Sequence, residues 1–280
     1  MFSFFASLFG YILNAIYGVV NNYGLAIILF TIIIKSVMLP ISIRQQKTMK
    51  KSAKIQVLAK EIQDKYKNDQ VRQSQELMEL YKRENMNPLS GCLSSIIQML
   101  IILSVFYLVS SPLTYMKRLD ANIVTDLVEQ VIEEDGASNV RYREIAVIKR
   151  FSDTDERVRI NMDFLGLDLS DVPTQNFKED PKVFVIPVLY VITSMISMKI
   201  TTSMNNRRKN NEDKPEKVDE NDEMQAIEDM NKQMMIMMPV MSVMIALIAP
   251  LGLALYWLVS NILMIIERLF LNKLFVEEEE

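Results

Sequence analysis

Residues 24 to 43 form an apolar stretch long enough to cross a membrane, and one cation, Lys35, lies near its middle. A helix would place Lys35 roughly 16 Å beyond Gly24, near the midplane of a hydrocarbon core about 30 Å thick. Lysine at that depth costs roughly 2.5 kcal/mol or more, so it normally faces protein or water. Thr31, one turn earlier, extends a polar stripe on the same face. The stretch therefore predicts a membrane helix that borders a polar cavity.

The alternative for this stretch is a short helix whose lysine extends to the membrane surface. Long lysine side chains reach the interface in this way when they lie close to a helix end. Pro40 supports this alternative, because proline bends or ends a helix. The sequence leaves both readings of Lys35 open.

Composition supports an integral membrane protein. The 280 residues are 50% hydrophobic and 24% charged, and the charges are concentrated in blocks between apolar runs. There is no histidine and one cysteine, Cys92. These counts exclude a disulfide within the chain, a histidine-based metal site and a histidine-dependent catalytic triad. We expect no metal and no cofactor.

The apolar runs and charged blocks predict an all-α integral membrane protein with a five-helix transmembrane core, a cytoplasmic helical hairpin and a small α+β extracytoplasmic insertion. The predicted segments are an N-terminal interfacial helix (1–23), a first span (24–43), the hairpin (44–87), a second span (88–113), the insertion (114–180), a third span (181–202), a cytoplasmic loop (203–233), a fourth span (234–250), a fifth span (251–272) and an acidic cytoplasmic tail (273–280).

The first 23 residues carry no charge, and their apolar residues recur at helical spacing. No basic region opens them, and no cysteine precedes Cys92, so neither a secretory signal peptide nor a lipoprotein signal is expected. We predict an uncleaved helix in the outer interface. A full additional span is the alternative.

The block from residue 44 to 87 contains eleven Lys and Arg against six Asp and Glu. A basic block next to a span belongs on the cytoplasmic side, which places the N-terminus outside and, after five spans, the C-terminus inside. Two narrow apolar edges, around Leu58 and Leu80, predict a helical hairpin with a turn at residues 67–70. The block is either a solvated loop attracted to anionic lipid or a docking platform for a cytosolic partner.

The insertion from residue 114 to 180 is more acidic than basic, which suits the outside. Residues 120 to 134 have helical periodicity. Residues 141–150 and 157–164 predict two strands joined by a turn at 152–155, because Val158, Ile160, Met162 and Phe164 alternate with polar residues.

The last apolar region divides at Pro250-Leu251-Gly252, which predicts a tight turn. Asn261 is a polar position in the fifth span, where such residues more often join helices than bind ligands. Trp257 lies in mid-span, either in the core or on a cavity wall. A run of methionines (Met234, Met235, Met237, Met238, Met241 and Met244) offers an adaptable surface, although ordinary packing explains it equally.

Four motifs in order resemble the YidC/Oxa/Alb family of membrane protein insertases in its bacterial form. They are Tyr23-Gly24-Leu25 through Lys35-Ser36-Val37-Met38-Leu39-Pro40, then Asn87-Pro88-Leu89-Ser90-Gly91-Cys92 with Ile97-Gln98-Met99, then Met238-Pro239-Val240, and finally Pro250-Leu251-Gly252 through Ser260-Asn261. They lie in the first, second, fourth and fifth predicted spans.

The resemblance implies a bacterial plasma-membrane insertase and chaperone, not an enzyme. It implies a groove among five helices that is open to the cytoplasm and to lipid but closed to the outside. Relatives carry an arginine in that groove where this chain has Lys35; lysine keeps the charge but loses the planar fork. Expected groove residues are Lys35, Thr31, Gln98, Trp257, Tyr256 and Asn261, and expected docking residues of the hairpin are Lys50, Lys51, Lys54 and Lys60.

The partners that the resemblance implies are nascent membrane proteins and membrane lipids, with the Sec translocon, the ribosome or the signal recognition particle system as further candidates. No direct contact with nucleic acid is expected. The basic tail with which some relatives bind ribosomes has no counterpart in the acidic residues 277 to 280.

Two other classes of function fit parts of the sequence. An anion or small-solute transporter would use Lys35, although no inverted repeat or second intramembrane charge is evident. A serine–lysine membrane hydrolase would pair Lys35 with a serine, but Ser36 is adjacent in sequence and does not face Lys35 on a helix.

Overall fold

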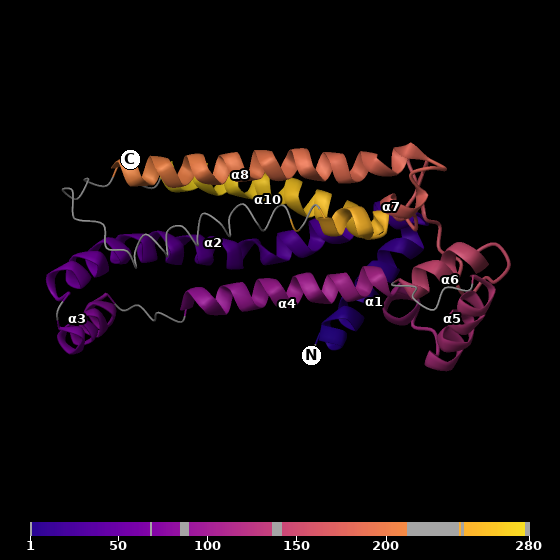
Figure 1. Cartoon of the computed structure of the whole chain (residues 1–280), viewed down its shortest axis with the longest axis horizontal. Helices are drawn as coiled ribbons and strands as arrows, with labels where there is room; N and C mark the ends of the chain where they lie inside the picture. Colours follow the sequence, from indigo (N-terminus) through magenta and orange to yellow (C-terminus); the bar gives the residue numbers. More distant parts are fainter. Residues whose placement is uncertain are drawn as a thin grey trace.

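The computed structural model describes residues 2–67, 69–84, 90–135, 142–211, 241 and 244–277. Long helices lie side by side as a bundle, with a short helix, α3, at one end and a small folded unit around α5 and α6 at the other (Figure 1). Most of the predicted fourth span (234–250), and with it most of the methionine run, lies outside the described residues; Met241 and Met244 are exposed.

Two helices meet at an asparagine pair near the N-terminus. Helix α1 (Phe2–Val20) ends at Asn21, whose φ of 47° lies in the left-handed region. Asparagine tolerates this conformation better than most residues. The side chain of Asn22 then accepts a hydrogen bond from Leu25 N at 3.0 Å and caps the next helix, α2 (Tyr23–Lys65).

Helix α2 is continuous over 43 residues and passes through Pro40 without ending. Its apolar part, Tyr23–Thr48, is one of the candidate membrane spans. The charged part runs on in the same helix, so no break separates the predicted first span from the predicted hairpin at residue 43. Proline removes one backbone hydrogen bond, and the long helix on either side tolerates that loss.

Helix α3 (Gln70–Arg83) folds back onto the charged part of α2. Asp69 caps it by accepting a hydrogen bond from Arg72 N at 3.0 Å. A small core joins the two helices; it contains Ile55, Ala59 and Leu80, with Ile62, Leu77 and Tyr81 packed around them. Ile55 and Ile62 of the first apolar edge thus meet the second edge around Leu80, whereas Leu58 is exposed.

The remaining long helices complete the bundle. They are α4 (Ser90–Ser110), α8 (Val185–Asn211), which follows the 3-10 turn η2 (Pro181–Phe184), and α10 (Leu251–Glu277). In the described part of the chain, four stretches are long and apolar enough to cross a membrane: Phe2–Val20, Tyr23–Thr48, Pro181–Ser203 and Leu251–Leu271. Met99–Ser110 is a shorter apolar stretch within α4. The N-terminal helix therefore has the length of a span, while its interfacial position stays a prediction.

The predicted turn at residues 250–252 is largely helical. Helix α10 begins at Leu251, so Leu251 and Gly252 belong to its first turn, and the bend lies before them at Ala249 and Pro250. Proline in front of a helix start is favourable because its missing N–H would have no helical partner there.

The 114–180 unit contains helix α5 (Ala121–Asp135), as its periodicity predicts, after the π-helical turn η1 (Leu113–Lys117). The predicted strand at 141–150 is wrong, because α6 (Arg143–Phe151) is a helix. Its buried residues, Ile145, Val147 and Ile148, form one face of that helix. The unit also contains one short helix, α7 (Pro173–Asn176).

The predicted strand at 157–164 is also mostly wrong. Only Asp163–Phe164 (β1) pairs as a strand, with Leu167–Asp168 (β2), in an antiparallel hairpin that turns at Leu165 and Gly166. The alternation nevertheless predicts burial correctly, since Val158, Ile160 and Met162 are all buried. An extended segment can bury alternate residues without a neighbouring strand.

The hydrogen bonds of that segment go to the helix junction instead. Tyr23 N donates to Asn161 O at 3.0 Å, Asn161 N donates to the Tyr17 hydroxyl at 2.8 Å, and Asn22 Nδ2 donates to Asp163 O at 2.7 Å. The Phe164 ring covers Gly24, where a Cβ atom would have no room. The start of α2 is thus fixed to the 114–180 unit.

The start of α10 is held by the same stretch of chain. Gly252 N donates to Leu169 O at 2.9 Å and Leu251 N donates to Asp171 O at 2.8 Å. The Asp171 carboxylate also forms an ion pair with Lys149 at 2.5 Å. We call residues 161–171 the anchor segment, because it binds the first backbone donors of both α2 and α10.

A buried carboxylate joins α6 to the end of α4. Glu144 accepts hydrogen bonds from Leu113 N at 2.7 Å, Thr114 N at 3.0 Å and the Thr114 hydroxyl at 2.6 Å. Burial raises the pKa of Glu144 above its ordinary value of 4.5, and these hydrogen bonds oppose that rise only in part. Glu144 therefore fixes η1 through these hydrogen bonds, although burial disfavours its charged carboxylate.

Gly10 of α1 allows a close helix contact that alanine would block. A Cβ atom there would collide with the Tyr115 carbonyl group of η1, which is backbone and cannot rotate away. Gly10→Ala should lower the free energy of unfolding by about 1–3 kcal/mol through overpacking. Gly18→Ala is the matched control, since nothing lies within 4 Å of its Cβ position. Thermal unfolding in detergent measures both; equal melting temperatures would contradict the contact.

Stability should depend on pH through Glu144. Because its folded pKa is raised, Glu144 favours the folded state at low pH, and this contribution is lost as the pH rises from about 4.5 through the raised value. Melting temperatures measured across this range should fall with rising pH, and Glu144→Gln should flatten the decline. Glu133→Gln, an exposed change on α5, should leave it intact. An unchanged decline in Glu144→Gln would refute this role.

Candidate functional site

Lys35 lies in the span portion of α2 and is half-buried. Thr31, on the same face, is buried, and its hydroxyl donates to Ile27 O of the same helix at 2.6 Å. The hydroxyl of Thr31 is thus already satisfied within α2, and Lys35 is the charged group of this face.

Two charged residues of the candidate span Leu251–Leu271 were not among the expected site residues. Glu267 and Arg268 are consecutive residues of α10 within the span Leu251–Leu271, and both are half-buried. Arg268 Nη1 donates to the Thr201 hydroxyl of α8. These two residues contradict the expectation that no second intramembrane charge is present. Their position inside a long apolar run of the sequence is the signal by which they could have been found.

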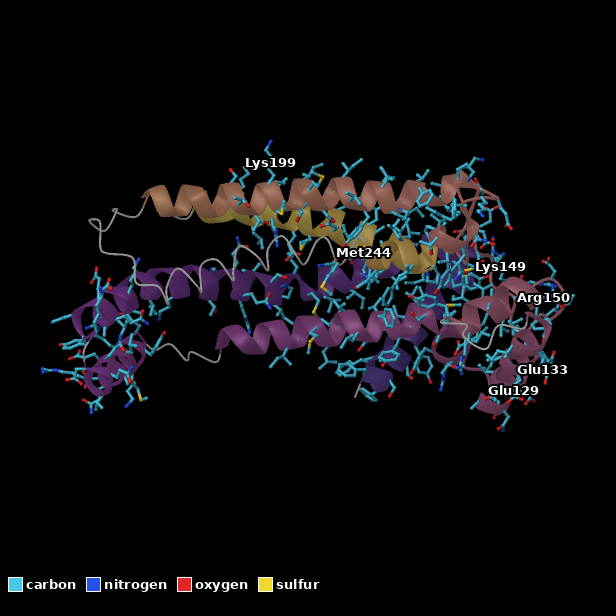
Figure 2. All side chains as sticks on the ribbon, in the orientation of Figure 1. Glu129, Glu133, Lys149, Arg150, Lys199 and Met244 are labelled. Atoms are coloured by element: carbon cyan, nitrogen blue, oxygen red, sulfur yellow. The ribbon has the colours of Figure 1, made fainter. Side chains whose placement is uncertain are left out.

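These charges act on Lys35 across the α2–α10 contact. Lys35 interacts electrostatically with Glu267, which is attractive, and with Arg268, which is repulsive. Glu267 and Arg268 also attract each other. The site therefore contains two cations and one anion from two neighbouring helices. Lys199, by contrast, lies in the α8 span but is exposed and extends outward from the bundle (Figure 2).

Two of the other expected groove residues of α10, Asn261 and Trp257, lie toward α8. Asn261 is buried, and its Nδ2 donates to the hydroxyls of Thr193 at 3.2 Å and Ser194 at 3.0 Å. The Trp257 ring packs against Tyr190, with ring centroids 6.2 Å apart. Asn261 and Trp257 thus join two helices. Tyr256 is buried as well.

The docking residues expected on the hairpin lie at the far end of the bundle from the 114–180 unit (Figure 1). Lys51 Nζ donates to the carbonyl oxygen of Glu84 at the end of α3, and Lys60 is exposed. The side chains of Lys50, Lys54 and Gln98 lie outside the described residues. The two described hairpin lysines, Lys51 and Lys60, thus do not join Lys35.

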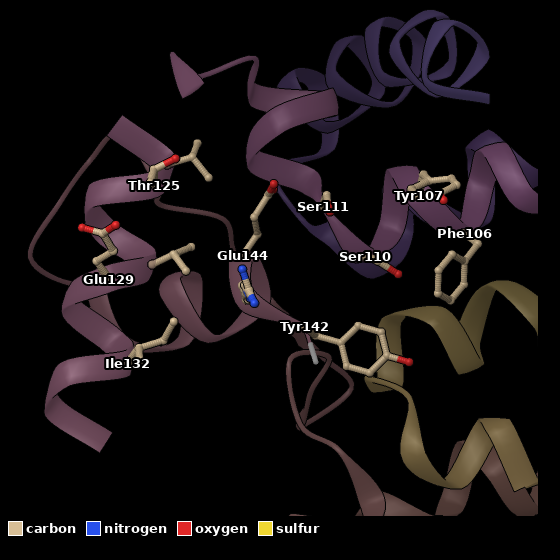
Figure 3. A pocket seen from close by; sticks show the side chains of 12 residues that line it. Phe106, Tyr107, Ser110, Ser111, Thr125, Glu129, Ile132, Tyr142 and Glu144 are labelled. Carbon is tan, nitrogen blue, oxygen red and sulfur yellow. The ribbon is translucent and has the colours of Figure 1, made fainter. Parts of the chain in front are cut away.

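A separate cavity of about 550 Å³ lies where α4 meets α5 and α6 (Figure 3). Its walls are mixed: Phe106, Tyr107, Ser110, Ser111, Val124, Thr125, Val128, Glu129, Ile132, Tyr142, Arg143 and Glu144. It lies between α4 and the 114–180 unit and is distinct from the charges around Lys35. Among the residues that the structure describes, no group of three or more His, Cys, Asp or Glu is placed to hold a metal ion.

Comparison with known families identifies one match over nearly the whole chain. Residues 15–279 match the sequence profile of the family described as 60Kd inner membrane protein. The match includes every candidate span except the beginning of α1, together with the hairpin and the 114–180 unit.

Individual relatives match over shorter stretches. A membrane protein insertase YidC of Chlorobaculum parvum is 47% identical over 92 residues, which is 33% of this chain and 16% of the relative. A membrane protein insertase YidC of Francisella tularensis subsp. novicida is 41% identical over 107 residues, or 38% of this chain and 19% of the relative. The aligned part thus covers less than a fifth of each relative.

The Asn261 hydrogen bonds should stabilise the α8–α10 pair. Asn261→Leu should lower the free energy of unfolding by roughly 0.6–1.7 kcal/mol, the range for hydrogen bonds between membrane helices. Ser36→Ala is a suitable control, because the Ser36 hydroxyl is exposed and donates to Ile32 O of its own helix at 2.8 Å. Unfolding in detergent by denaturant titration measures both. Equal stabilities would show that Asn261 is free for another role.

Proposed function

Since the chain belongs to the 60Kd inner membrane protein family, which is the YidC/Oxa/Alb family, we propose that it is a membrane protein insertase and chaperone. It moves short extracytoplasmic segments of substrate proteins through a hydrated, positively charged groove and releases their helices into lipid. The observation that carries this proposal is the half-buried Lys35 in an apolar span.

The charge of Lys35 accounts for the first step. A polar tail that enters bare hydrocarbon meets a barrier of several kcal/mol for each unpaired group. Water around Lys35 and Arg268 lowers that barrier, and an acidic tail is attracted to the cations at a strength that depends on hydration. The expected groove residues are those named from the sequence: Lys35, Thr31, Gln98, Trp257, Tyr256 and Asn261.

Burial of the substrate's own apolar helix drives the second step. Transfer of apolar surface from water gains roughly 25 cal/mol for each Å², so a membrane-length helix supplies its own driving force. No nucleotide or ion gradient is required. The exposed apolar side chains of α2 and α8, such as Val37 and Met195, border the lipid into which the substrate moves.

The proposed arrangement places the N-terminus outside and the C-terminus in the cytoplasm of a bacterial cell. The five-helix core contains the apolar parts of α2, α4, α8 and α10 together with the segment 234–250. The basic hairpin of α2 and α3 then lies in the cytoplasm, where basic blocks belong, and the 114–180 unit lies outside. The hairpin receives nascent membrane proteins, with Lys50, Lys51, Lys54 and Lys60 as its docking residues.

Further partners follow from the same placement. The hairpin can contact the Sec translocon, the ribosome or the signal recognition particle system, and anionic lipid headgroups attract its basic residues. No direct role of nucleic acid is proposed.

A second candidate function is transport of an anion or small solute, and Glu267 and Arg268 favour it. Transporters hold intramembrane charges in pairs along a path. A hydrolase that uses Ser36 has less support, since the Ser36 hydroxyl donates to Ile32 O and not to Lys35. Solute flux in vesicles, compared between the wild type and Lys35→Ala, separates transport from insertion.

Complementation tests the insertase. Cells depleted of their own YidC receive this chain or its Lys35→Ala, Lys35→Arg or Lys35→Glu variant. Protease accessibility reports insertion of a single-span substrate with an acidic N-terminal tail. Wild type and Lys35→Arg should restore insertion, and Lys35→Glu should reduce it about tenfold or more, because reversing a charge about 4 Å from an acidic group changes their interaction by roughly 2 kcal/mol even at the dielectric constant of water.

Lys199→Glu is the matched control, because this lysine also lies in a candidate span but faces outward (Figure 2). It should restore insertion as the wild type does. If Lys35→Glu restores insertion fully, hydration alone serves the substrate and Lys35 only extends to the surface. If the folded wild type restores nothing, the insertase proposal fails and flux measurements decide the alternative.

A further inference from the structure

The span that lies beside Lys35 carries the one acidic residue in the sequence of the four candidate spans, Glu267. An ionisable residue in a membrane span is rare because it costs several kcal/mol unless it is paired. A carboxylate placed beside a cation that is meant to attract acidic substrates requires an explanation, since it weakens that attraction.

The two helices start at the same level, which fixes the relative depths of Lys35 and Glu267. A Cβ atom on Gly252 would lie 3.5 Å from the Tyr23 ring and 3.8 Å from Ile27 Cδ1, so the first turns of α10 and α2 are in contact. With a rise of 1.5 Å for each residue, Glu267 lies about 5–10 Å further along the bundle than Lys35. The two side chains form no direct ion pair within 4.0 Å in the described part of the chain, so their charges act across this offset at longer range.

Arg268 has a different partner. Its guanidinium donates to Thr201 of α8, which turns it toward the opposite neighbour of α10. Glu267 thus has one cation next to it in sequence, held by α8, and a second cation on the neighbouring helix α2. Its interaction with Lys35 is attractive, and that of Arg268 with Lys35 is repulsive. The net charge of these three side chains is +1.

We propose that Glu267 is the resident counter-ion of Lys35 and that it sets how acidic a substrate segment must be to enter the site. This inference rests on the proposed insertase function. In the resting protein Glu267 partly neutralises Lys35, which lowers the cost of a cation in the membrane. An acidic substrate segment competes with Glu267 for Lys35, whereas a neutral segment gains nothing by displacing it.

This arrangement predicts a rescue. Lys35→Ala leaves Arg268 and Glu267, with net charge zero, so the remaining carboxylate repels acidic segments. Lys35→Ala with Glu267→Gln restores net charge +1 through Arg268. Insertion of an acidic-tail substrate should therefore recover by about threefold or more over Lys35→Ala, since a charge ~8 Å away changes binding by roughly 2- to 30-fold at effective dielectric constants of about 80 to 20.

The insertion experiment uses the full-length protein in cells depleted of YidC and two substrates that differ only in tail charge. Glu267→Gln alone should favour the acidic tail over the neutral tail more than the wild type does. Glu133→Gln, an exposed change on α5, is the charge-matched control and should preserve the wild-type ratio. An unchanged ratio in Glu267→Gln, or no recovery in the double variant, would overturn the proposal.

A thermodynamic cycle tests the pairing without any insertion readout. Melting temperatures in detergent are measured for the wild type, Lys35→Met, Glu267→Gln and the double variant. The two changes should be non-additive, with the double variant more stable than the sum of the single effects predicts. Additive effects would show that the two residues are uncoupled. If the wild type inserts nothing in cells, the proposed function fails, and this cycle still decides the ion pairing.

Discussion

The structure depends on how the first backbone N–H groups of its central helices are satisfied. A helix start leaves four N–H groups without helical partners, and each of them needs another acceptor. The anchor segment, residues 161–171, supplies carbonyl oxygens to Tyr23, Leu251 and Gly252. One short stretch of the 114–180 unit thereby fixes the starts of α2 and α10 relative to each other. The depths of Lys35 on α2 and of Glu267 on α10 follow from that common origin.

The two sides of α10 have different characters. Toward α8 it forms direct side-chain contacts: Asn261 with two hydroxyls, Trp257 with Tyr190, and Arg268 with Thr201. Toward α2 the charges of Lys35 and Glu267 act at longer range. Packed, hydrogen-bonded contacts hold a fixed geometry, whereas partly hydrated charges can exchange partners. The α8–α10 pair is thus joined by specific side-chain contacts, and in the proposed function the charged face toward α2 is the one that meets the substrate.

Helices and buried positions that depend on local residue patterns could be predicted from the sequence. Contacts between residues far apart in the chain could not. The apolar runs gave the long helices, and the alternation at Val158, Ile160 and Met162 correctly predicted their burial. It could not show that Asn161 bonds to a helix start more than a hundred residues away. A strand was expected at 141–150, but the structure has a helix. The burial of Ile145, Val147 and Ile148 fits either the helical or the strand period over so short a stretch, so the sequence pattern could not distinguish them. Glu267 and Arg268 were overlooked because the surrounding run is strongly apolar.

The continuity of α2 has a mechanical consequence. A helix of 43 residues is about 65 Å long, and it is fixed at one end by the anchor segment and carries α3 at the other. A tilt of α2 by about 5° around its fixed end moves the far end by roughly 6 Å. The same tilt moves Lys35, which lies about 18 Å from the fixed end, by less than about 2 Å. Pro40 removes one hydrogen bond beyond Lys35, so bending concentrates on the far side of the cation. A partner can therefore displace the hairpin widely while the charged site keeps its position.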